Sequence, residues 1–254
     1  MFAARPSLAN GPGGHLLCPL AGALLTLSFA PFGFWPAAPI SLALLFALIN
    51  GSSPAVGLFR GWLFGVGLFG SGASWIYVSI HTYGSASPAL AGTLTVIFCL
   101  AMALFCALPV WVYLRWFSGR RARFLAFSAA WTLGEMFRSS ALTGFPWLLV
   151  GTSQIDAPLQ GYFPLIGVYG VTLLVAISAS VVVEGWRKRR LALIAVLLIW
   201  PAGPLLDRID WTTSAKTPIV VALIQSNIPQ ELKWRPSELQ RIIDIHVDMS
   251  KDAW

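Results

Sequence analysis

Acidic side chains are rare before residue 207 of this chain, where only Glu135, Asp156 and Glu184 carry a carboxylate. Long apolar segments lie between them, and 57% of all residues are hydrophobic. Charged residues make up 11% of the chain, against about 25% in soluble domains. So few charges suit a lipid environment, in which each helix pairs its own backbone polar groups. The sequence therefore predicts a polytopic α-helical membrane bundle over residues 16–206.

Seven segments have the apolar composition of membrane-spanning helices: 16–34, 35–49, 56–80, 89–116, 124–138, 162–183 and 191–206. The second is shorter than the roughly 20 residues that a helix needs to cross a bilayer. Residues 16–49 are therefore expected to form a hairpin of two short or tilted helices. Whether both of these helices cross the membrane is left open.

Basic residues alternate between the loops that join these segments. They follow the second, fourth and sixth segments: Arg60; Arg115, Arg120, Arg121 and Arg123; Arg187, Lys188, Arg189 and Arg190. The loops after the first and third segments have none, and the loop after the fifth has only Arg138. This pattern follows the positive-inside rule. It predicts a cytoplasmic lead over residues 1–15, a periplasmic C-terminal part and a bacterial inner membrane. The net charge of +7 thus reflects topology, and no nucleic-acid partner is expected.

Small residues recur at helical spacing in the third segment. Gly57, Gly61 and Gly65 are four residues apart, and Gly67 with Ser71 repeats the pattern. Small side chains at this spacing let two helix backbones approach closely in lipid. The third segment is therefore predicted to pack tightly against its neighbours.

The fifth segment runs into an apolar stretch, residues 143–150, that Gly144 and Pro146 interrupt. Broken backbone at membrane depth occurs where it is buried in protein or lines a cavity, so the stretch indicates a site. Trp147 lies within it and is either an interfacial tryptophan or part of that site. Glu135 and Arg138, three residues apart, are either an ordinary pair at a helix end or the lining of a substrate path.

The character of the sequence changes after a periplasmic linker, residues 207–216. The run 219–224 is apolar and rich in β-branched residues, which is typical of a buried strand. Ser237 and Gln240 have the spacing of a capping box, and apolar residues then recur with helical period. Residues 217–254 are therefore predicted to begin a soluble α/β domain. Trp234, just after the strand, is either an interfacial anchor or a site residue.

No metal site or cofactor is predicted. Cys18, Cys99 and Cys106 all lie in apolar segments and lack the spacing of metal ligands. Buried cysteines of this kind usually pack as small hydrophobic residues. They are not expected to act as nucleophiles.

Five short motifs occur in order along the chain. They are Phe29–Gly33 (FAPFG), Glu135-x-x-Arg138, Thr143–Trp147 (TGFPW), Ser153–Asp156 (SQID), and Gln225-x-Asn-Ile-Pro-Gln230 followed by Leu232-Lys-Trp234. Together they resemble the bacterial apolipoprotein N-acyltransferases, from about residue 16 to the end of the chain. This resemblance implies a membrane bundle followed by a periplasmic nitrilase-like α-β-β-α domain. It also implies acyl transfer from a membrane phospholipid to the amino group of a diacylglyceryl-cysteine apolipoprotein, through an acyl-thioester on the enzyme.

The same resemblance implies a catalytic glutamate, lysine and cysteine, all of which would lie beyond Trp254. No residue of this chain is assigned those roles, so the chain is expected to be a truncated form that is inactive alone. Four residues match substrate-side positions, near the access route for lipid: Trp234, Trp147, Phe145 and Pro146. Glu135 and Arg138 match family positions for which a structural role is expected.

Two other functions remain open. A transporter or channel would place ionisable residues within its spans, and this sequence has almost none there. A non-enzymatic membrane anchor that displays a partner-binding domain would not require the five motifs. The motifs therefore favour the acyltransferase.

Overall fold

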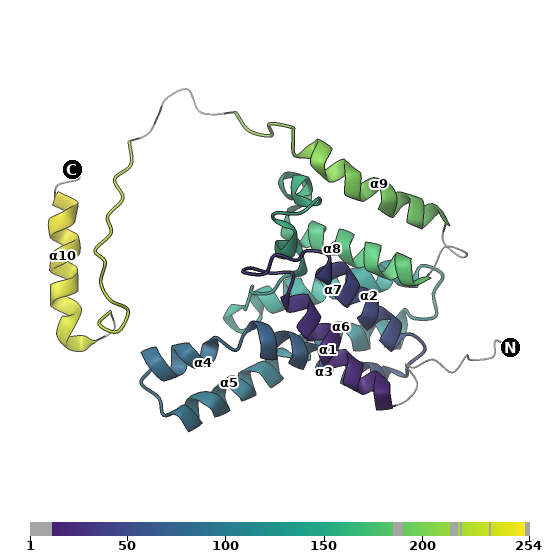
Figure 1. Ribbon diagram of the computed structural model, residues 1–254, viewed down its shortest axis with the longest axis horizontal. Helices are drawn as coiled ribbons and strands as arrows, with labels where there is room; N and C mark the ends of the chain where they lie inside the picture. Colours follow the sequence, from purple (N-terminus) through teal and green to yellow (C-terminus); the bar gives the residue numbers. More distant parts are fainter. Residues whose placement is uncertain (1–11, 185–189, 214–217, 219, 234, 252–254) are drawn as a thin grey trace.

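The computed structural model describes residues 12–184, 190–213, 218, 220–233 and 235–251. All regular secondary structure in these ranges is helical (Figure 1). The longer helices are α1 (Pro12–Thr26), α2 (Ala37–Ile49), α3 (Pro54–Gly72), α5 (Pro88–Met102), α6 (Leu104–Trp116), α7 (Arg123–Ser140), α8 (Phe163–Glu184), α9 (Arg190–Leu206) and α10 (Leu239–Lys251). Short helical turns are α4 (Ile76–Val78), the π-helix η2 (Ser79–Tyr83) and the 3-10 turns η3 (Ala141–Thr143), η4 (Val150–Gln154), η5 (Gln160–Tyr162) and η6 (Pro236–Glu238).

Two continuous helical stretches are long and apolar enough to cross a membrane. They are Pro88–Trp116, which joins α5 to α6, and Gln160–Glu184, which contains α8. A third span results if α3 and the segment Ile76–Tyr83, bent by 58° at the break between them, are counted as one. The remaining predicted spans correspond to the shorter apolar helices α1, α2 and α9 and to α7, which carries three charged residues. Residues 16–49 form the expected pair of short helices, although α1 begins earlier, at Pro12.

The small residues of α3 lie where neighbouring backbones approach. A Cβ atom added at Gly65 would lie 2.6 Å from the Cα of Ala103, and one at Gly61 would lie 3.0 Å from the Cα of Ala107. A Cβ at Gly67 would overlap the backbone of Pro19 in α1. The predicted close packing of this segment is therefore confirmed, against α6 on one side and α1 on the other.

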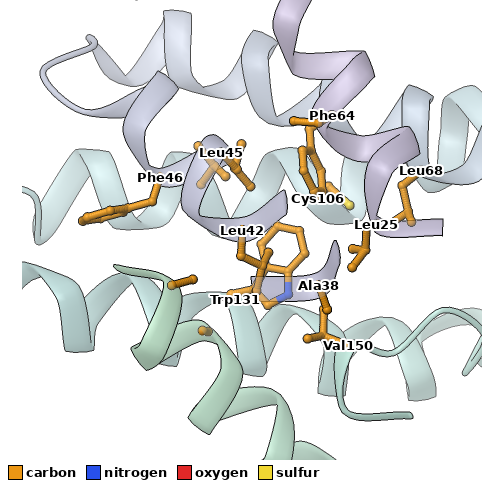
Figure 2. Packing of buried hydrophobic residues seen from close by; sticks show 14 of the residues in the cluster. Leu25, Ala38, Leu42, Leu45, Phe46, Phe64, Leu68, Cys106, Trp131 and Val150 are labelled. Atoms are coloured by element: carbon orange, nitrogen blue, oxygen red, sulfur yellow. The ribbon is translucent and has the colours of Figure 1, made fainter. Parts of the chain in front are cut away.

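The apolar core gathers side chains from helices that are far apart in the sequence. Figure 2 shows Trp131 of α7 among the labelled side chains of α2, α3 and η4. Ring contacts continue the core, since Trp131 meets the edge of Phe64 at 5.6 Å between ring centroids. Helix α2 packs against α8 as well as against α1, so the bundle closes on itself.

The loops gather at two ends of the bundle. At the end that we call the basic end, the Arg123 side chain donates hydrogen bonds to Glu184 and, over 3.0 Å, to Asn50 Oδ1. The opposite end consists of residues 27–36, 73–87 and 141–162. There the rings of Trp75 and Trp147 lie 6.1 Å apart. The broken stretch predicted from the sequence belongs to this opposite end.

The predicted buried strand is not formed in the described part of the chain. Residues 220–224 have no regular secondary structure, and Val220 and Leu223 are 98% and 93% exposed. The physical reason is that a strand buries its side chains and pairs its backbone only against neighbouring strands. Ile219, the first residue of that run, lies outside the described residues.

The predicted C-terminal helix is present as α10, although its start differs. One 3-10 turn, η6, precedes the helix, which then begins at Leu239. Instead of completing a capping box with Ser237, the Gln240 side chain donates to Asp244 Oδ1 at 2.9 Å. Apolar side chains nevertheless recur along α10 at the expected spacing, and Leu239, Ile243 and Val247 are exposed.

Candidate functional site

The backbone after α7 adopts an unusual conformation. Leu142, Thr143 and Leu148 have positive φ angles of 53°, 76° and 57°, and Gly144 has one of 84°. For residues other than glycine this conformation costs of order 1–3 kcal/mol each and persists only where the surroundings enforce it. The structure shows two buried side chains of α7 that hold the segment.

Arg138 binds the backbone of the broken stretch. Its Nη1 donates to the carbonyl oxygens of Phe145, at 2.7 Å, and Trp147, at 2.6 Å. Its Nη2 lies 3.4 Å from the carbonyl oxygen of Leu148. The guanidinium carbon also lies 5.4 Å from the centroid of the Phe69 ring. The Arg138 side chain, which is 3% exposed, thus binds three backbone carbonyl groups of the segment.

Glu135 binds the point where the segment becomes helical again. Its Oε1 accepts hydrogen bonds from the Val150 backbone N–H, at 3.0 Å, and from Trp131 Nε1, at 3.2 Å. Its Oε2 accepts from the hydroxyl of Thr172 at 2.9 Å, which in turn accepts from the Gly151 N–H at 2.8 Å. Among the described contacts no ion pair joins Glu135 to Arg138. Arg138 binds the carbonyl groups of residues 145–148, and Glu135 binds the N–H of Val150.

Glu135 and Arg138, which we call the clamp, hold residues 143–150, the clamped segment. This segment places two aromatic rings at different depths. Phe145 packs inward, 5.2 Å from Phe98 and 6.2 Å from Phe69 between ring centroids. Trp147 stacks on Phe145 at 5.1 Å but remains 53% exposed. Pro146, which has no backbone N–H to satisfy, lies between them. The arrangement fixes one face of Trp147 and leaves the rest of its ring accessible.

A pocket lies beside this segment, and two of the sequence motifs line it. Residues 28–33 form one wall and residues 152–156 form the other, around a volume of about 390 Å³. A neighbouring pocket of about 290 Å³ shares Asp156 and adds Asp207. The motifs Phe29–Gly33 and Ser153–Asp156, more than a hundred residues apart in the sequence, therefore meet at the opposite end of the bundle.

Some participants could not be found from the sequence. Thr172 lies in the middle of an apolar helix and Trp131 is one of 12 tryptophans, so neither stood out. Trp234, in contrast, was predicted but lies outside the described residues. The described residues form no group of three His, Cys, Asp or Glu side chains that could hold a metal ion.

The three cysteines of the chain lie away from the surface. Cys18, Cys99 and Cys106 are all buried. Cys106 borders a cavity of about 10 Å³ beside Glu135 and Arg138, which is about the space of one water molecule. The candidate site consists of the exposed Trp147, stacked on Phe145, and a pocket with both polar and apolar lining.

These features define an α-helical membrane protein whose broken segment and adjacent pocket lie at one end of the bundle. Residues 21–181 match the profile of the apolipoprotein N-acyltransferase N-terminal domain. The chain belongs to the apolipoprotein N-acyltransferase family, a family of acyltransferases.

Curated relatives extend the similarity beyond the matched domain. The chain is 44% identical over 246 residues to the apolipoprotein N-acyltransferase of Pseudomonas syringae pv. tomato, covering 93% of this chain and 49% of the relative. It is 45% identical over 246 residues to the apolipoprotein N-acyltransferase of Pseudomonas paraeruginosa, covering 93% of this chain and 48% of the relative. It is 41% identical over 247 residues to that of Coxiella burnetii, with 94% and 51% covered. The chain thus spans about half the length of these relatives.

Proposed function

We propose that this chain supplies the membrane part of an enzyme that transfers an acyl group from a phospholipid to the amino group of a diacylglyceryl-cysteine apolipoprotein. The observation that carries the proposal is the similarity to relatives named apolipoprotein N-acyltransferase along 93% of the chain. Both substrates are lipids anchored in the bilayer, so a membrane bundle with a site at one end can receive both from the side.

Within this function, the clamped segment guides lipid. Trp147, supported by Phe145 and Pro146, forms the access surface, since an exposed indole ring binds the boundary between acyl chains and headgroups well. Glu135 and Arg138 act as positioning residues for that surface. Trp234 is assigned to the same access route by resemblance to the family.

The chemical steps are assigned to a nitrilase-like domain that residues 217–254 begin. By resemblance, a cysteine thiolate takes the acyl group as a thioester, a glutamate acts as general base and a lysine stabilises the oxyanion. No residue among 1–254 is assigned these roles. A polypeptide of residues 1–254 alone is therefore proposed to be inactive in acyl transfer.

The location proposed is the bacterial inner membrane, crossed several times. The N-terminus is cytoplasmic and the residues after 207 are periplasmic. The alternation of basic loops supports this orientation, and it puts the opposite end of the bundle on the periplasmic side, where the lipoprotein substrate resides.

A fusion protein tests the function. Residues 1–254 would be joined to the part of the Pseudomonas syringae relative that this chain does not cover, and reconstituted with a phospholipid and a diacylglyceryl-cysteine peptide. The fusion is expected to acylate the peptide, whereas residues 1–254 alone should not. A folded, membrane-inserted fusion without activity would refute the proposed function, and activity of residues 1–254 alone would refute the proposed inactivity.

Two matched tryptophans test the access surface in the same fusion. Trp147 and Trp116 are both 53% exposed, but Trp116 lies at the basic end. Trp147→Ala is expected to raise KM for the phospholipid severalfold with little change in kcat, and Trp116→Ala to change neither. Equal effects of the two substitutions would show that Trp147 is an ordinary interfacial tryptophan.

A further inference from the structure

The polar side chains that line the pocket between residues 28–33 and 152–156 offer hydrogen-bond acceptors. Ser28, Thr152 and Ser153 each donate their single hydroxyl proton to a backbone carbonyl within their own turn, over 2.6, 2.7 and 2.6 Å. A hydroxyl has one donor, so these three can only accept further hydrogen bonds, and Ser153 Oγ already accepts one from Gln154 Nε2 at 2.9 Å. Pro31 offers the pocket a carbonyl and no N–H.

A carboxylate completes this lining. Of the three acidic residues before residue 207, Glu135 is hydrogen-bonded within the clamp and Glu184 pairs with Arg123. Asp156 lines the pocket, and the described residues give it no hydrogen bond or ion pair. None of the residues that line the pocket is Lys, Arg or His. Asp156 is an exposed residue of the loop, so its carboxylate is open to solvent and to a ligand in the pocket.

We infer that this pocket binds a primary ammonium group. An ammonium carries three N–H donors and a positive charge, which matches a set of acceptors beside one carboxylate. A phosphate would find neither a cation nor a free hydroxyl donor there. Phe29 also lines the pocket, and an aromatic residue there suits a cation. The volume of about 390 Å³ is within the range of small-molecule sites.

This inference rests on the proposed function for the source of the ammonium. Two substrates of that reaction can carry one: a phospholipid with an amino headgroup, and the lipopeptide with its free α-amino group. The chemistry at the pocket is the same for both. The experiment therefore has one arm for each.

Binding to the purified 254-residue chain can be measured by native mass spectrometry. In the lipid arm, phosphatidylethanolamine is compared with phosphatidylcholine of the same acyl chains, whose quaternary nitrogen has no N–H. In the peptide arm, a diacylglyceryl-cysteine peptide is compared with its N-acetylated form. The wild type is expected to prefer the free amine roughly fivefold in at least one arm, the size of an exposed charge-assisted contact. The arm that shows the preference identifies the source.

Asp156→Asn is expected to abolish that preference, because the amide keeps the shape and removes the charge. Asp210→Asn, an exposed acid outside both pockets, is the matched control and should retain it. A second variant, Ala30→Lys, places a cation in the pocket from an exposed position and should also weaken binding of the free amine. The inference is overturned if the wild type shows no preference in either arm, or if Asp156→Asn and Ala30→Lys keep it.

The outcome can be separated from that of the proposed function. The binding measurement needs no catalysis, and the fusion protein measures acyl transfer directly. Transfer by the fusion, together with an unchanged amine preference in Asp156→Asn, would overturn this inference alone.

Discussion

At the scale of single residues, the clamp shows what a sequence can and cannot indicate. The spacing of Glu135 and Arg138 places both on one side of a helix, and the broken stretch beyond them is equally visible in the sequence. Their partners are not, because they are backbone groups of residues 145–150 and the hydroxyl of Thr172. Backbone partners carry no signature in the sequence and become neighbours only when the chain has folded.

Removing the Glu135 carboxylate should destabilise the protein. Glu135→Ala leaves the Trp131 indole N–H, the Val150 N–H and the Thr172 hydroxyl without their buried acceptor. We expect a loss of about 3 kcal/mol in the free energy of unfolding, measured by denaturant titration in detergent micelles. Glu135→Gln keeps one oxygen as acceptor for Trp131 and Val150, so we expect the free energy of unfolding to fall by only about 1 kcal/mol. If both variants were as stable as the wild type, the hydrogen bonds of Glu135 would not stabilise the fold as we expect.

At the scale of elements, most helices could be predicted from the sequence, but two features of the elements could not. The hairpin of α1 and α2 and the glycine face of α3 follow from local composition. The 58° bend after α3 and the exposed conformation of residues 220–224 do not. The bend depends on how α4 and η2 pack against α5, and a strand depends on neighbouring strands. Both are set by contacts outside the segment itself.

Two glycines of α3 provide a test of close helix packing. A Cβ at Gly65 would lie within 3.0 Å of the Cα, carbonyl oxygen and Cβ of Ala103, whereas one at Gly70 would meet nothing within 4 Å. Gly65→Ala should therefore lower the free energy of unfolding by about 1–3 kcal/mol through overpacking. Gly70→Ala should leave it unchanged or raise it by up to about 1 kcal/mol, since alanine favours the helix. The expected order would be disproved if Gly65→Ala unfolded at the same denaturant concentration as Gly70→Ala.

At the scale of the whole molecule, contacts between distant segments occur at two ends of the bundle. Arg123 joins three segments at the basic end, and two motifs meet at the opposite end. The alternation of basic residues in the sequence predicts which loops share a side of the membrane, and this stays a prediction. It does not indicate that α2 packs against α8, because this contact joins helices that are distant along the chain.

The proposed orientation can be measured with a thiol reagent that does not cross membranes. All three native cysteines are buried, so the background should be low. Thr82→Cys is at the opposite end and Gly119→Cys at the basic end, both at exposed positions. In spheroplasts we expect labelling of Thr82→Cys, and labelling of Gly119→Cys only after the membrane is permeabilised. The reverse pattern would invert the proposed topology.

The contacts of Arg123 also have a consequence for the order in which the protein is assembled during synthesis. Asn50 is made 73 residues before Arg123, and Glu184 is made 61 residues after it. The complete set of hydrogen bonds between the three segments therefore cannot form until the ribosome has passed residue 184. Until then the face of α2 that α8 will cover has to be sheltered by lipid or by the insertion machinery. Completion of this contact is therefore a late step in the synthesis of the chain.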